Sequence, residues 1–185
     1  MLQFKIQIKE IKKPPVWRRV VIPESFTFHR FHEVIQTAFG WDDCHLYSFS
    51  PKGYGSEPNI TIPSDEDWEP VLDSTEIKLK EIFNQKGQTY TYTYDFGDNW
   101  THQITLEEIT DKRILKASCI AGKSTCPPED CGGPWGYEEL KEIFATRPDS
   151  DEANELREWL GLEPNEIWNP NDFDLDDTND WVRDV

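Results

Sequence analysis

The sequence predicts an α+β domain of β-grasp-like (ubiquitin-like) type, in which a mixed sheet packs against one helix. Apolar and polar residues alternate over residues 1–10, which is typical of a half-buried strand. A Lys-Lys-Pro-Pro turn then leads into a second apolar segment at 16–22, so the two segments predict a hairpin. Apolar residues next recur at spacings of three and four over 28–39, which predicts a helix. Hairpin, helix and then strand is the opening order of a β-grasp domain.

The predicted helix carries signals at both of its ends. Thr27 is suited to cap the first turn, and Gly40 is suited to end the last one. We expect the helix to lie across the sheet through its apolar stripe, which consists of Phe28, Phe31, Ile35 and Phe39. On the same segment, His29 and His32 would be neighbours, and we interpret them as a packed or half-exposed pair.

The middle of the chain predicts more strands and one long loop. Residues 41–50 predict a third strand, and the Gly-, Pro- and acid-rich residues 51–76 predict a loop. A short helical turn is expected at 77–83. Further strands are expected at 89–94, 100–109 and 113–118.

The last third predicts two helices and an acidic tail. Apolar stripes lie within 137–144 and 156–160, and aromatic residues spaced along the tail indicate that it packs onto the body. We interpret residues 1–185 as a single domain. It would comprise a β-grasp-like body (1–118), a Cys/Pro/Gly loop (119–134), and a helical cap with the acidic tail (135–185).

The charge is strongly negative and unevenly distributed. The chain has 19 Lys and Arg against 36 Asp and Glu, a net charge of −17. Residues 61–185 hold eleven basic and thirty acidic residues, a balance of −19. We therefore expect no direct binding to duplex DNA, whose phosphates require cationic contacts. The charge fits a solvated acidic surface that keeps the protein soluble, a basic protein partner or a bound cation.

The cellular compartment follows from two absences in the sequence. No run of about 18 apolar residues is present, so we expect no membrane span. The first ten residues lack the apolar stretch of a secretion signal. We expect a cytoplasmic protein with reduced cysteines.

Cysteines in a turn-rich segment indicate a candidate zinc site. Cys119, Cys126 and Cys131 follow one another closely, and His102 on the preceding hairpin supplies a fourth ligand of the type that zinc prefers. The alternatives are buried thiols or a Cys126–Cys131 link formed on oxidation.

Acidic residues near the same segment indicate a second kind of site. A divalent-metal-dependent hydrolase or nuclease-like enzyme would draw its catalytic groups from Asp95, Asp98, His102 and Glu129. With Asp130, these carboxylates are also suited to a hard cation, or simply to hydrogen bonding within turns. Asp42, Asp43 and His45 are further acid–base candidates. We expect the turn at 96–99 and the loop at 119–133 to meet, with His102 facing the junction.

Several strings of residues, in order along nearly the whole chain, resemble a known family. They are Pro-Val-Trp-Arg-Arg-Val at 15–20, the segment 32–43 with His45, Tyr-Asp-Phe-Gly-Asp at 94–98 with Trp100 and His102, and Cys-Pro-Pro-Glu-Asp-Cys-Gly-Gly at 126–133. The chain resembles the plasmid-ORF-three-like family of PRiA type, also described as insertion-element passenger proteins of TnpR type. The resemblance implies a small α+β domain and no established biochemical activity. Family members often read His-Leu-His where this chain has His45-Leu46-Tyr47, so a role that needs both histidines is in doubt.

The sequence reveals no reaction. It favours a cytoplasmic binding or interaction module with an optional structural metal, such as zinc. The alternatives are the metal-dependent hydrolase and an accessory protein of mobile DNA elements.

Overall fold

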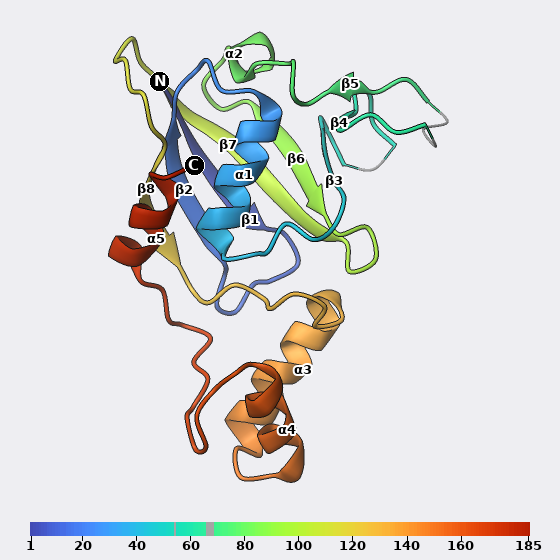
Figure 1. Ribbon diagram of the computed structural model, residues 1–185, viewed down its shortest axis with the longest axis vertical. Coiled ribbons are helices and arrows are strands. Elements are labelled where there is room, and N and C mark those ends of the chain that lie inside the picture. Colours follow the sequence, from blue (N-terminus) through green and yellow to red (C-terminus); the bar gives the residue numbers. More distant parts are fainter. Residues whose placement is uncertain (54, 66–68) are drawn as a thin grey trace.

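The computed structural model describes residues 1–53, 55–65 and 69–185, and it has an α+β architecture (Figure 1). The described residues form one eight-stranded sheet in the order β5-β4-β3-β6-β7-β1-β2-β8. Its strands are β1 (Leu2–Ile8), β2 (Trp17–Ile22), β3 (Tyr47–Ser50), β4 (Ile60–Thr61), β5 (Leu72–Asp73), β6 (Thr89–Tyr94), β7 (Trp100–Ile109) and β8 (Ser118–Lys123). The helices are α1 (Phe28–Phe39), α2 (Leu79–Ile82), α3 (Gly133–Thr146), α4 (Asp151–Trp159) and α5 (Leu175–Val182).

The predicted N-terminal hairpin is confirmed. Strands β1 and β2 pair antiparallel, with Leu2 opposite Ile22 and Gln7 opposite Trp17. The apolar residues of β1 are all buried, as the alternation requires. Strand β1 also pairs antiparallel with β7, so it lies inside the sheet rather than at its edge. The narrower β-grasp assignment stays a prediction, because this sheet has additional strands on both sides.

Helix α1 has the predicted boundaries and lies across one face of the sheet (Figure 1). The Thr27 side chain accepts a hydrogen bond from the Arg30 amide, and Gly40 ends the helix with a φ of 79°. The predicted stripe of Phe28, Phe31, Ile35 and Phe39 is buried. The Phe31 ring lies 4.8 Å from the Phe4 ring of β1, so the helix joins the sheet through aromatic contacts.

Two predicted strands are wrong in their boundaries. The third strand comprises only Tyr47–Ser50, because residues 41–46 turn away from the sheet and Asp43 adopts a φ of 53°. The strand predicted at 113–118 instead forms at Ser118–Lys123, where it pairs with β2. The boundary expected at residue 118 therefore falls inside β8, and part of the expected loop is strand. Residues 54 and 66–68 of the predicted loop at 51–76 lie outside the described residues.

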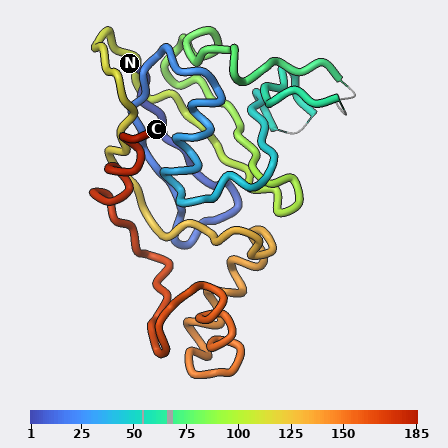
Figure 2. Tube along the Cα trace, in the orientation of Figure 1, coloured from blue at the N-terminus to red at the C-terminus, as the bar shows by residue number. Residues whose placement is uncertain are grey.

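The C-terminal third leaves the sheet and returns to it. Helices α3 and α4 form a pair beyond one end of the sheet, and α5 then packs beside α1 and β8 (Figure 2). The predicted packing of the tail onto the body is confirmed for Phe173, whose ring lies 4.1 Å from the guanidinium of Arg18 on β2, whereas Trp168 packs on the helical cap, 5.7 Å from Tyr137 of α3. Trp181 stays largely exposed. Helix α5 was not predicted.

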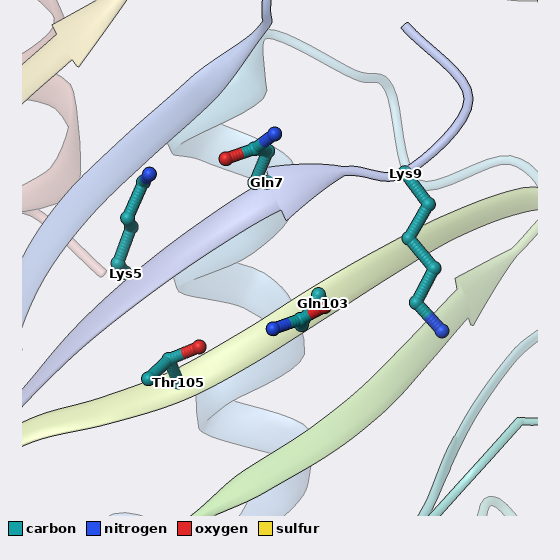
Figure 3. A pocket seen from close by; sticks show the side chains of 5 residues that line it. All are labelled: Lys5, Gln7, Lys9, Gln103 and Thr105. Carbon is teal, nitrogen blue, oxygen red and sulfur yellow. The ribbon is translucent and has the colours of Figure 1, made fainter. Parts of the chain in front are cut away.

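On the opposite face of the sheet, β1 and β7 carry polar side chains (Figure 3). A shallow pocket of about 190 Å³ there is lined by Lys5, Gln7, Lys9, Gln103 and Thr105. Through the part of the chain that is described, no helix combines the length and apolar character needed to cross a membrane.

Candidate functional site

Three segments that are distant in sequence meet at one end of the sheet. They are residues 41–46 after α1, the turn 95–99 between β6 and β7, and the loop 126–133 before α3. The Gly132 amide donates to Asp98 Oδ2 at 3.1 Å. A Cβ atom on Gly133 would come within 2.8 Å of the Asp98 carbonyl oxygen, so only glycine permits this approach. These contacts confirm the predicted meeting of turn and loop.

The turn holds its carboxylates through backbone hydrogen bonds. Asp95 adopts a φ of 51°, and its Oδ1 accepts from the Gly97 amide at 2.9 Å. Asp98 uses Oδ2 to accept from Gly132. Hydrogen bonding to the backbone therefore accounts for one carboxylate oxygen of Asp95 and one of Asp98. The Asp95 Oδ2 atom is not used in the turn and faces His45.

His45 lies at the centre of the junction. Its Nε2 atom is 3.2 Å from Asp130 Oδ1, 3.8 Å from Asp95 Oδ2 and 3.8 Å from Glu129 Oε2. Neither His45 Nε2 nor Glu129 Oε2 has a hydrogen-bond partner among the described residues, although both atoms are buried. A buried polar atom without a hydrogen bond is costly, so these two atoms call for a further partner such as a water molecule or an ion. We call His45, Asp95, Glu129 and Asp130 the His45 cluster.

The second oxygen of Glu129 is fixed by the surrounding structure. Glu129 Oε1 accepts from the Tyr94 hydroxyl and from the Asp42 amide, both at 2.9 Å. Burial, and then the hydrogen bond to Glu129, raise the pKa of Tyr94 well above its ordinary value, so the phenol keeps its proton and donates. Trp41 stacks on the Tyr94 ring at 4.9 Å and donates from Nε1 to the Pro127 carbonyl. Glu129 is therefore pre-positioned with Oε2 directed at His45.

The His45 cluster has the composition of a metal site. Two groups of potential ligands overlap at His45. Within each group, the ligand atoms lie within 4.8 Å of one another: Cys44–His45–Glu129 and His45–Asp95–Asp130. Two ligands at about 2.0–2.1 Å from a tetrahedral ion are about 3.3 Å apart, which is close to the separations around Nε2. One imidazole with carboxylates and a nearby thiol is a donor set suited to zinc or a similar divalent ion.

The cysteine set predicted for zinc is not brought together with His102. His102 is buried among aromatic rings, at 5.1 Å from Phe39 and 5.2 Å from both Trp41 and Tyr92. Burial lowers its pKa to about 3. The expectation that His102 faces the junction is corrected, because its side chain has the inward parity of β7. Trp41 lies between it and the loop, since its ring contacts His102 and its Nε1 donates to the Pro127 carbonyl.

The three cysteines lie in different surroundings. Cys119 is on the edge strand β8, three strands from β7. Burial raises the pKa of the Cys126 thiol, although the positive charge of Arg18 acts in the opposite direction. Burial also raises the pKa of the Cys131 thiol to about 12. These thiols are protonated at neutral pH, as expected for the buried-thiol alternative. No group of three or more potential ligands among the described residues contains Cys119, Cys126, Cys131 or His102. Zinc binding itself stays a prediction.

His32 forms a separate and fully satisfied network. Its Nε2 is 2.7 Å from Asp43 Oδ1, its Nδ1 is 2.8 Å from the Tyr92 hydroxyl, and its ring stacks on Tyr47 at 3.6 Å. Burial lowers the pKa of His32 to about 4 even though Asp43 opposes the shift. The predicted packed pair is present, with the His29 ring 6.0 Å away.

Sequence reasoning named His45 only as an acid–base candidate beside Asp42 and Asp43. It did not connect His45 with Asp95 and Glu129, which are 50 and 84 residues later in the chain. The available signal was the adjacency of Cys44 and His45, two potential ligands, directly after a predicted helix.

Comparisons with known proteins found a family model, a curated relative and a solved structure that each match most of this chain. The family model described as "Plasmid pRiA4b ORF-3-like protein" matches residues 1–177. The chain is 34% identical over 167 residues to "Uncharacterized protein y4hQ" of Sinorhizobium fredii, covering 87% of this chain and 81% of that protein. It is also similar to the crystal structure of "Protein of Unknown Function MM3350" from Methanosarcina mazei, with a TM-score of 0.79, 35% identity and coverage of 95% and 96% of the two chains.

Proposed function

The chain belongs to the plasmid pRiA4b ORF-3-like family, and from that premise we propose that it is a binding module whose functional site holds a divalent cation in the His45 cluster. The observation that carries the proposal is the pair of buried atoms without a hydrogen bond, His45 Nε2 and Glu129 Oε2, which face each other at 3.8 Å, with Asp130 Oδ1 at 3.2 Å from the same nitrogen. A cation between them would satisfy both atoms at once.

The charge balance supports the same proposal. Asp95, Glu129 and Asp130 converge on a single imidazole. Among the described ion pairs, none joins any of these three carboxylates to a lysine or arginine. Carboxylates held close together repel one another, and a divalent ion would offset that repulsion.

Zinc is the first ion to test, because it accepts imidazole nitrogen and carboxylate oxygen at four-coordinate sites. Manganese is the comparison, since it favours oxygen ligands. Compared with the predicted set of His102 and three cysteines, the His45 cluster needs no thiolate. The buried thiols would first have to lose their protons to ligate zinc.

The test is isothermal titration calorimetry of zinc chloride into protein freed of metal by chelation. We expect one ion per chain for the wild type and a loss of at least roughly tenfold in affinity for His45→Ala, since even indirect partners of metal ligands contribute that much. His29→Ala is the matched histidine control and keeps wild-type affinity. Unchanged binding by His45→Ala, or loss of binding by Cys119→Ser, would overturn the proposal.

A second candidate is a hydrolase that uses the same cation. The observation that favours it is the open side of the cluster, where the Asp130 side chain is 71% exposed and leaves room for a substrate. A divalent ion polarises a bound substrate or water, and a nearby carboxylate accepts a proton.

We place the protein in the cytoplasm. A role as an accessory of mobile DNA elements has only the plasmid in the family's description to support it.

A further inference from the structure

A groove between α3 and α4 opens directly beside the His45 cluster. It has a volume of about 450 Å³, which is within the range of ligand-binding pockets. Its floor and walls are apolar and are formed by Leu140, Ile143, Leu156 and Trp159. Asp130 and Cys131 form the end nearest to His45. The groove and the His45 cluster therefore share Asp130.

The rim of the groove is acidic. Glu139, Glu152 and Glu155 line it together with Asp130, and no lysine or arginine is among its lining residues. Glu152 is engaged by Arg147 at 2.6 Å, whereas the described ion pairs include none for Glu139 or Glu155. Both of these side chains belong to exposed residues on facing helices. A ligand in the groove would meet negative charge on both sides.

Trp159 adds an aromatic surface to one wall. The residue is 49% exposed and lines the groove, so its ring is accessible to a ligand there. An exposed indole attracts guanidinium and ammonium groups through its ring face. Apolar floor, acidic rim and exposed indole together select a ligand that is both basic and partly apolar.

We propose that this groove binds a basic peptide segment that alternates arginine or lysine with aliphatic residues. Aliphatic side chains would enter the groove, and cationic side chains would reach Glu139, Glu155 and Trp159. A second copy of this chain does not fit, because residues 61–185 carry a balance of −19. The inference names the partner of the proposed binding module and rests on that function, although it does not require the cation.

The experiment is a fluorescence anisotropy titration with a labelled twelve-residue peptide of alternating Arg and Leu, at physiological salt. Two comparison peptides replace Arg by Glu or Leu by Ser. We expect the Arg–Leu peptide to bind in the micromolar range, the Arg–Ser peptide at least tenfold more weakly, and the Glu–Leu peptide not at all.

The variants separate the groove from the general charge of the protein. Glu139→Gln with Glu155→Gln is expected to weaken binding at least tenfold, and Trp159→Ala at least fivefold. Glu142→Gln with Glu158→Gln removes the same charge from exposed positions of the same two helices outside the groove. This control changes the affinity by less than twofold. Equal weakening by both double variants, or equal binding of the Glu–Leu peptide, would overturn the inference.

The two proposals fail separately. His45→Ala in chelator-treated protein is expected to keep its affinity for the Arg–Leu peptide. Peptide binding without zinc binding would overturn the cation site alone. Zinc binding without binding of any of the three peptides would overturn the groove alone.

Discussion

His32 on α1 and His45 in the segment after α1 both lie close to acidic side chains, but their ring nitrogens differ in hydrogen bonding. Both ring nitrogens of His32 have partners, Asp43 and Tyr92, and the ring is inaccessible to solvent. His45 has carboxylates from three residues within 3.8 Å, a partly exposed ring and a buried Nε2 without a hydrogen bond. A buried histidine with two partners holds a fold together, whereas an unpartnered one beside carboxylates is available to a ligand.

The largest expected difference between the two histidines is in stability. His32→Ala removes two hydrogen bonds and leaves a cavity beneath Tyr47, so we expect a loss of about 2–4 kcal/mol in the free energy of unfolding. His45→Ala in metal-free protein should change it by less than about 1 kcal/mol, because the ring is partly exposed and its Nε2 makes no hydrogen bond. Urea denaturation of both variants measures this. Equal losses would mean that His45 is also a structural residue.

The next effect is the dependence of stability on pH. The folded-state pKa of His32 is about 4, below the value of 6.5 for an exposed histidine, because burial disfavours the charged ring. The unfolded chain therefore binds more protons between these values, and the free energy of unfolding falls as the pH decreases from 6.5 to 4. The fall is on the order of 3 kcal/mol from His32, and His102 acts in the same direction.

Urea denaturation at pH 7, 5.5 and 4.5 measures this dependence. His32→Gln should flatten it, because the substitution removes the buried ring whose pKa is lowered. The same slope in His32→Gln as in the wild type would show that His32 does not titrate as its burial requires.

Sequence patterns predict the surroundings of His32 better than those of His45. The β1–β2 hairpin and α1 could be predicted, because the alternation of Phe4 and Ile6 and the spacing of Phe31 and Ile35 are local patterns. The packed state of His32 was also accessible, since it lies beside Phe31 on the helix. Strand β8 was misplaced, because an edge strand is fixed by its partner β2, nearly a hundred residues earlier.

Local sequence patterns could not predict the candidate site. The residues around His45 come from turns and loops that are distant in sequence, and Asp95 and Asp130 adopt positive φ values there. The burial of His102, by contrast, could have been predicted, because it shares the inward parity of Trp100, Ile104 and Leu106 along β7.

The smallest expected effect concerns nucleic acid. We expect no measurable binding of duplex DNA at physiological salt, because residues 61–185 carry a balance of −19. The lysines at the sheet pocket, Lys5 and Lys9, are the local exception. Anisotropy titration with a labelled duplex measures this, and sub-micromolar binding with a steep salt dependence would show that the sheet face outweighs the total charge.

The most direct test of the account is an anomalous difference map from crystals of the protein grown with zinc chloride. We predict a peak about 2.0–2.2 Å from His45 Nε2, with Glu129 and at least one of Asp95 and Asp130 among its other ligands. No peak at His45, or a peak ligated by Cys119, Cys126, Cys131 or His102 instead, would contradict the account.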